Sequence, residues 1–189
     1  MILLIKTNKE NLHDNEFVNP IEDIVTRNEL RDIRQVKAKK EETRIRSYKE
    51  LKKEDLEKAD KIIISGTSLK DNEFLEDLEK FSWIKDCEKP LLGICAGAQI
   101  VGIVFGGKLK KKTEIGMTKL TFEKKFLGIS EEKEVYELHN NYVTFGKDFE
   151  IFAKNKIPQA AKHKDKDIYC TLFHPEVKNK EMIKNFTQI

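Results

Sequence analysis

The amino-acid sequence predicts an α/β fold with a mostly parallel central sheet and extra antiparallel strands. In the first half of the chain, short apolar runs at Met1–Thr7, Lys61–Ser65 and Pro90–Cys95 alternate with segments of helical pattern. Short strands separated by helices indicate βαβ units, whose strands run parallel. From Lys108 onward, strand candidates follow one another without intervening helices, which favours antiparallel pairing there.

The helices of the first half have local signals. Asn19 and Pro20 supply a cap and a first-turn proline for a helix over Ile21–Leu30. Apolar residues at helical spacing predict a second helix over Glu73–Asp86. The other expected elements are a strand at Asp32–Lys39, an exposed charged segment at Lys37–Lys53, helices near Glu54–Ala59 and over Ala96–Phe105 and Lys178–Phe186, and strands at Lys108–Lys112, Met117–Phe122, Glu134–Leu138, Phe149–Ala153, Gln159–His163 and Ile168–Phe173.

Length and composition indicate a single globular domain over residues 1–189. The net charge is only +3, which is too balanced for a nucleic-acid binder. No apolar run approaches the ~18 residues of a membrane span, and the N-terminus lacks the basic start and cleavage site of a signal peptide. Three cysteines without paired spacing suit a reducing compartment. We therefore expect a cytoplasmic protein that binds neither nucleic acid nor membrane.

The strongest chemical signal is Gly93-Ile-Cys95-Ala-Gly97, at the end of an apolar run. Glycines on both sides of a cysteine allow a sharp turn from a strand into a helix, with the sulfur exposed at the turn. The positive end of the following helix favours the thiolate over the thiol. The alternative is a buried structural cysteine, and we interpret Cys87 and Cys170, which lack such glycines, in that way.

A base and its partner follow far downstream, in Phe173-His174-Pro175-Glu176. His174 can act as the base for the cysteine, and Glu176 can hold and polarise the imidazole. A surface turn could produce the same three residues by chance, but here they follow a predicted strand and come after Cys95. The sequence therefore predicts a Cys-His-Glu enzyme of acyl transfer.

These two motifs, Gly93-x-Cys95-x-Gly97-x-Gln99 and His174-Pro175-Glu176, resemble the signatures of the class I glutamine amidotransferases. The resemblance implies a three-layer, flavodoxin-like domain that hydrolyses L-glutamine to glutamate and ammonia through a cysteine thioester. It implies that Cys95, His174 and Glu176 form the catalytic triad. It also implies that no metal or organic cofactor is needed for this chemistry.

Weaker similarities imply a substrate pocket. The loop Ile64-Ser-Gly66-Thr67-Ser68 resembles the family's oxyanion loop, so that the backbone amides of Thr67 and Ala96 would hold the oxyanion. By the same resemblance, Gly66, Gln99, His139 and Asn140 would bind the substrate. Thr67, Ser68 and Asn141 depart from the family pattern, in which glycine, proline and aspartate stand at these places.

The resemblance also implies a partner. Within the family, the general likeness is to the stand-alone glutaminase subunit of a two-subunit GMP synthase. Because the chain ends soon after the His-Pro-Glu segment, we expect the ammonia to pass to an ATP-dependent synthetase on a separate chain. Two alternatives stay open: a Cys-His-Glu hydrolase of another γ-glutamyl or amide substrate, and a catalytically silent binding module with the same fold.

Overall fold

The computed structural model describes residues 1–27 and 42–189. Its strands are β1 (Ile2–Lys6), β2 (Thr43–Ser47), β3 (Lys61–Ile64), β4 (Leu91–Ile94), β5 (Lys108–Phe126), β6 (Ile129–Thr144), β7 (Phe149–Lys154), β8 (Pro158–His163) and β9 (Ile168–Thr171). Its α-helices are α1 (Asp14–Phe17), α2 (Asn19–Arg27), α3 (Lys53–Lys58), α4 (Ala96–Val104) and α5 (Glu181–Phe186). Three 3₁₀ helices are η1 (Asn11–His13), η2 (Glu73–Leu75) and η3 (Leu78–Asp86).

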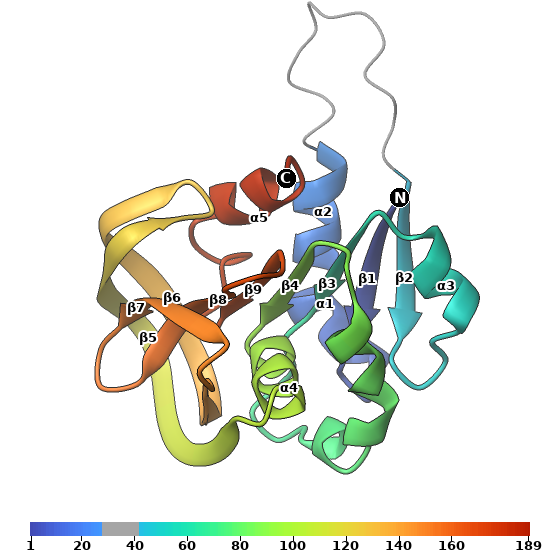
Figure 1. The fold of residues 1–189 in the computed structure, drawn as a ribbon, viewed down its shortest axis with the longest axis horizontal. Coiled ribbons are helices and arrows are strands. Elements are labelled where there is room, and N and C mark those ends of the chain that lie inside the picture. Colours follow the sequence, from blue (N-terminus) through green and yellow to red (C-terminus); the bar gives the residue numbers. More distant parts are fainter. Residues whose placement is uncertain (28–41) are drawn as a thin grey trace, which may run out of the picture.

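All of these strands join in one mixed sheet, in the order β2-β1-β3-β4-β9-β8-β7-β5-β6 (Figure 1). Strands β2, β1, β3, β4 and β9 pair in parallel. Strands β8, β7, β5 and β6 continue the sheet in antiparallel pairs. The predicted α/β fold is confirmed. The change of pattern at Lys108 marks the start of the antiparallel part, but β9 returns to the parallel part and pairs in parallel with β4.

Helices cover both faces of the parallel strands, which gives three layers (Figure 1). The two faces follow from the alternation of side chains along a strand. On β3, Ile63 packs in a core with Ile21 of α2 and Phe186 of α5. The neighbouring Ile62 and Ile64 pack in the opposite core with Phe81 of η3 and with the first turns of α4. Because helices cover both faces, side chains on both faces of a strand such as β3 are buried, which explains its continuous run of apolar residues.

The second half of the chain is dominated by the long hairpin of β5 and β6. Leu127 and Gly128 connect the two strands with φ of +46° and +85°, as a tight hairpin turn requires. The predicted strands at Lys108–Lys112 and Met117–Phe122 belong to one continuous strand, because the intervening Glu114 to Gly116 also pair with β6. A register shift between Lys111 and Glu114 marks the place where the sequence pattern was interrupted.

Two expectations for the first half are wrong. The charged segment Lys37–Lys53 contains β2, an edge strand whose Arg44 and Arg46 both face Asp55 of α3, at 3.0 and 3.4 Å. An edge strand pairs on one side only, so it tolerates a charged sequence that is otherwise typical of an exposed segment. Over Glu73–Asp86 the backbone forms the short 3₁₀ helices η2 and η3 in place of one α-helix, and neither has a side-chain N-cap.

The prediction of a strand at Asp32–Lys39 and of the end of the helix at Ile21–Leu30 lies outside the described residues. Among the residues that the structure describes, no helix is long and apolar enough to cross a membrane.

Candidate active site

Cys95 lies at the sharp turn between β4 and α4, as the flanking glycines predict. Its backbone has φ +50° and ψ −100°, a conformation that is strained for a residue with a side chain. Two contacts hold it there. The Cys95 amide donates to the Thr171 carbonyl of β9 at 2.8 Å. In addition, Gly97 lies so close to β3 that a Cβ atom would be 2.3 Å from the Ile64 carbonyl oxygen.

His174 lies in a turn that follows β9. Its amide donates to the Tyr136 carbonyl of β6 at 2.9 Å, and its ring packs against Phe17, with centroids 5.5 Å apart. Its Nδ1 is 2.7 Å from Oε1 of Glu176, and both side chains are almost fully buried. Since the carboxylate only accepts, Nδ1 carries a proton and donates it to Glu176.

Gly66 brings the cysteine and the histidine together. A Cβ atom on Gly66 would lie 2.6 Å from Cε1 of His174 and 3.3 Å from Cβ of Cys95. Both side chains therefore pack against the same bare backbone. Nε2 of His174 is buried and, in the part of the chain that the structure describes, has no hydrogen-bond partner. A proton on this atom is thus free for a reacting group.

The electrostatics of this group favour the charged form of the His174 imidazole. Burial lowers the pKa of His174, but the negative charges of Glu176 and of the Cys95 thiolate outweigh it and raise this pKa well above its usual value. Burial alone raises the pKa of the Cys170 thiol, which lies on β9. Cys170 is therefore an unreactive thiol at neutral pH, whereas Cys95 has a cationic partner.

The two amides expected to hold an oxyanion are unpaired. Across residues 1–27 and 42–189, neither the Thr67 amide nor the Ala96 amide donates a hydrogen bond to another protein group. Thr67 does not have a positive φ, so the departure from glycine at this place strains no backbone. Instead, its hydroxyl donates to Asp71 Oδ2 at 3.1 Å, which fixes the loop through a side chain.

A small cavity beside Cys95 is closed by contacts between the loop after β3 and strand β6. Asn140 Nδ2 donates to the Leu69 carbonyl at 3.0 Å, and Asn141 Nδ2 donates to Asn72 Oδ1 at 3.2 Å. Gln99 is buried, lines this cavity and donates to the Asn141 carbonyl at 3.0 Å. The remaining volume is about 20 Å³, too little for an amino acid.

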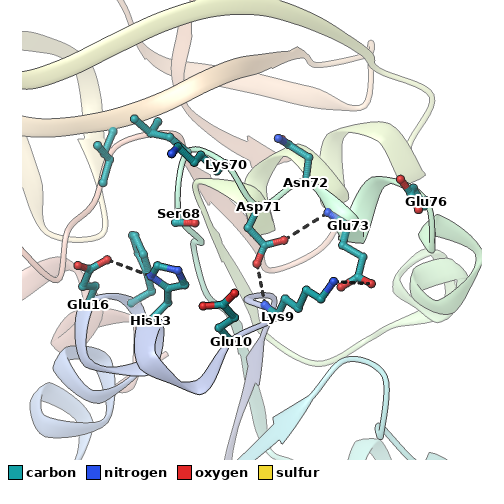
Figure 2. A pocket seen from close by; sticks show the side chains of 13 residues that line it. Lys9, Glu10, His13, Glu16, Ser68, Lys70, Asp71, Asn72, Glu73 and Glu76 are labelled. Atoms are coloured by element: carbon teal, nitrogen blue, oxygen red, sulfur yellow. Dashed lines mark hydrogen bonds and ion pairs between the residues drawn. The ribbon is translucent and has the colours of Figure 1, made fainter.

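A wide cleft of about 850 Å³ lies outside this cavity and shares one wall with it. Figure 2 shows Asp71 at the centre of this cleft, with the backbone amides of Lys9 and Glu73 donating to its carboxylate at 2.6 and 3.3 Å. Asp71 is the only acidic residue that lines the inner cavity among the described residues. Sequence reasoning missed it, because no motif marks an aspartate in this loop.

His139, predicted to bind substrate, lines the same cavity, but its ring nitrogens face elsewhere. Nδ1 lies 3.2 Å from the Lys112 carbonyl, and Nε2 lies 3.2 Å from Glu137 Oε2. The predicted roles of Gly66, Gln99, His139 and Asn140 toward a substrate stay predictions.

Fold and site together define an α/β protein with a cysteine at a strand-to-helix turn beside a buried His-Glu pair, and comparison with known proteins specifies the family. The family model of the class I glutamine amidotransferases matches residues 20–188. The chain is 33% identical over 148 residues to a glutamine-hydrolysing GMP synthase subunit of Thermoplasma acidophilum, covering 71% of this chain and 74% of the relative. The protein of the same name from Saccharolobus solfataricus is 32% identical over 146 residues, covering 70% and 78%.

Solved structures agree on the fold. A putative GMP synthase subunit from Thermoplasma acidophilum superposes with a TM-score of 0.79 at 24% identity, covering 100% of this chain and 93% of that one. A glutamine amidotransferase from Thermotoga maritima gives a TM-score of 0.67 at 18% identity, covering 100% and 81%. The chain belongs to the class I glutamine amidotransferase family, as its motifs predicted.

The charge of Glu176 predicts a change in pH dependence. Because Glu176 raises the pKa of His174, the imidazolium persists to higher pH than in a free histidine. In Glu176→Gln, we expect the alkaline limb of kcat/KM for glutamine to move down by ~1 pH unit or more. Activity at the optimum should fall less than in His174→Ala, because an orienting residue is partly dispensable.

The exposed Glu181→Gln, on α5, is the matched control and should leave the pH profile in place. An unmoved alkaline limb in Glu176→Gln, with the fold intact by circular dichroism, would show that Glu176 does not set the protonation of His174.

Proposed function

We propose that this chain is the glutaminase subunit of a two-subunit synthase that resembles GMP synthase, with residues 1–189 forming one glutaminase domain. The observation that carries the proposal is the packing of Cys95 and His174 against Gly66, with Glu176 bound to the far nitrogen of the imidazole. The names of the similar proteins support glutamine as the substrate and GMP as the product of the assembly.

The geometry supports a two-stage reaction. The Cys95 thiolate attacks the side-chain carboxamide carbon, and the amides of Thr67 and Ala96 hold the resulting oxyanion. His174 donates its Nε2 proton to the departing nitrogen, so the C–N bond breaks and ammonia leaves. Water then attacks the thioester and gives a proton to His174. The C–S bond breaks, glutamate leaves, and the thiolate–imidazolium pair is restored.

We place the α-ammonium group of glutamine on Asp71. When the carboxamide lies at Cys95, the amino-acid end of glutamine reaches toward the outer cleft, where Asp71 lies between the two cavities. Its carboxylate accepts from two backbone amides and from the Thr67 hydroxyl, which fixes its position between the cavities. Asn141 is neutral and turned to Asn72, so it cannot supply this charge.

We further propose a cytoplasmic location and a separate ATP-dependent synthetase as the consumer of ammonia. The relatives carry the name of one subunit of GMP synthase, which supports an assembly of more than one chain. The outer cleft supports a surface at which a partner acts on the loop from Ser68 to Asn72, because this loop separates the cleft from Cys95. Docking would favour a loop position in which the inner cavity is open.

Removing the charge of Asp71 tests the orientation of the substrate. In Asp71→Asn, we expect KM for glutamine to rise by ~10–100-fold, since a hydrogen bond to a charged group is lost. Hydrolysis of the analogue that lacks the α-amino group, 4-carbamoylbutanoate, should change little. Equal losses for both substrates would mean that Asp71 only shapes the loop. Glu76→Gln, in the outer cleft alone, is the control.

Steady-state hydrolysis with and without the synthetase tests the proposed function as a whole. Because the cavity at Cys95 is closed, we expect the purified chain to release glutamate slowly, and the synthetase with its nucleotide substrates to raise the rate by ~10-fold or more. A rate of tens per second without a partner would rule out gating. Hydrolysis of γ-glutamyl peptides in place of glutamine would favour a different hydrolase. The absence of hydrolysis under every condition would favour a silent binding module.

A further inference from the structure

A second group of chemically active side chains lies behind the wall of the Cys95 cavity. Glu114 of β5 and Glu137 and His139 of β6 each direct one ligand atom into a common space, and these atoms lie within 4.8 Å of one another. Glu137 and His139 are almost fully buried. The proposed reaction at Cys95 uses none of the three carboxylate and imidazole groups, so their convergence calls for a separate explanation.

The hydrogen bonds of His139 leave one ring nitrogen facing two carboxylates. Nδ1 lies 3.2 Å from the Lys112 carbonyl, which only accepts, so Nδ1 carries the proton. Nε2 lies 3.2 Å from Glu137 Oε2 and 3.4 Å from Glu114 Oε2. A nitrogen lone pair and two anionic oxygens repel one another unless a cation, either a second ring proton or a metal ion, lies between them.

The distances favour a metal ion. Charge-assisted hydrogen bonds are ~2.7–2.9 Å long, and the buried pair of His174 and Glu176 in this chain fits that range at 2.7 Å. The two contacts of His139 Nε2 are longer. A tetrahedral ion with ligands at ~2.0–2.1 Å keeps neighbouring ligand atoms ~3.3 Å apart. The distances from His139 Nε2 to the two carboxylate oxygens, 3.2 and 3.4 Å, are close to this value.

Unpartnered atoms point to the same conclusion. Glu137 Oε1 is buried and has no hydrogen-bond partner among the described residues. Gln159 of β8 is also buried; its Nε2 donates to Glu114 Oε2 at 2.9 Å, while its Oε1 is unpartnered in the described part of the chain. Lys112 pairs with Glu114 at 2.7 Å, so that Glu137 is the carboxylate that lacks full compensation. A buried carboxylate without full compensation is strongly unfavourable, and a divalent ion would satisfy it.

An ion can reach this place. A cavity of about 250 Å³ opens beside the group and is lined by Glu114, Glu137 and the strand segment from Ile115 to Thr118. The Lys112 carbonyl that fixes Nδ1 of His139 is the kind of outer contact that orients a metal-binding imidazole.

We propose that Glu114, Glu137 and His139 bind one divalent transition-metal ion, of the class of Zn²⁺, with a water molecule from the adjoining cavity as its fourth ligand. The ion ties β5 to β6 directly behind Leu138, whose carbonyl accepts a hydrogen bond from Cys95 Sγ at 3.6 Å, and next to Asn140, which contacts the loop over the cavity. It takes no part in the chemistry at Cys95. This inference concerns the hairpin alone and does not depend on the identity of the substrate or of the partner.

Zn²⁺ binding to the purified, tag-free chain tests the proposal. The catalytic pair can itself bind Zn²⁺ through a thiolate and an imidazole, so all measurements use a Cys95→Ser background. After removal of metal with a chelator, equilibrium dialysis and metal analysis should give one Zn²⁺ per chain, and Zn²⁺ should raise the midpoint of thermal unfolding. Co²⁺ should give visible absorption bands without the near-ultraviolet band of a thiolate ligand.

Three variants make the test specific. Glu137→Gln and His139→Gln should each weaken Zn²⁺ binding by ~100-fold or more, while Glu132→Gln, exposed on the same strand, should not. If the buried variants do not fold, Glu114→Gln serves in their place, because its side chain is partly exposed. The absence of stoichiometric binding at 100-fold excess metal (about millimolar) would overturn the proposal. Zn²⁺ binding that is unchanged in Glu137→Gln would overturn it as well. In either case a second ring proton on His139 would be the cation between the carboxylates.

Discussion

The structure depends on the close approach of three backbones around Cys95. The residue takes a left-handed conformation that a side chain disfavours by ~1–3 kcal/mol. The Cys95 amide donates to the Thr171 carbonyl of β9. Helix α4 can lie close to β3 because Gly97 has no Cβ atom, and Gly66 for the same reason leaves room for His174. The strain is tolerated because the doubly covered parallel sheet fixes all three backbones at once.

The two halves of the sheet contribute different parts of the site. The parallel strands position Cys95 and the unpaired amides of Thr67 and Ala96 at their carboxyl ends, where ligands bind in such sheets. The antiparallel hairpin holds the His174 backbone through the Tyr136 carbonyl and forms the far wall of the cavity. A change in the hairpin therefore reaches both His174 and the cavity beside Cys95.

The sequence was informative where local chemistry decides the structure. The glycines around Cys95 and the order of Cys95 before His174 predict the turn, the helix and the triad from short segments. His174, Pro175 and Glu176 lie in a turn, in which the Val177 amide donates to the His174 carbonyl. The side chains of His174 and Glu176 meet because the turn is anchored on β6.

Features that depend on distant partners could not be predicted in the same way. The charged β2 is a strand because it pairs with β1 and because its arginines meet Asp55. The role of Asp71 follows from the folding of its loop over Cys95, and the convergence of Glu137 with His139 and Glu114 depends on the register of a long hairpin. Neither the pairing of β2 nor the place of Asp71 leaves a periodicity or a motif in the sequence.

The central claim is that Cys95 forms the covalent bond to the substrate. Rapid acid quenching during glutamine turnover, followed by mass spectrometry of the digested chain, measures this directly. The account predicts a γ-glutamyl group on the peptide that contains Cys95, and no such adduct and no turnover in Cys95→Ala, whereas Cys170→Ala and Cys87→Ala keep both. An adduct on Cys170 or Cys87, or undiminished turnover in Cys95→Ala, would contradict it.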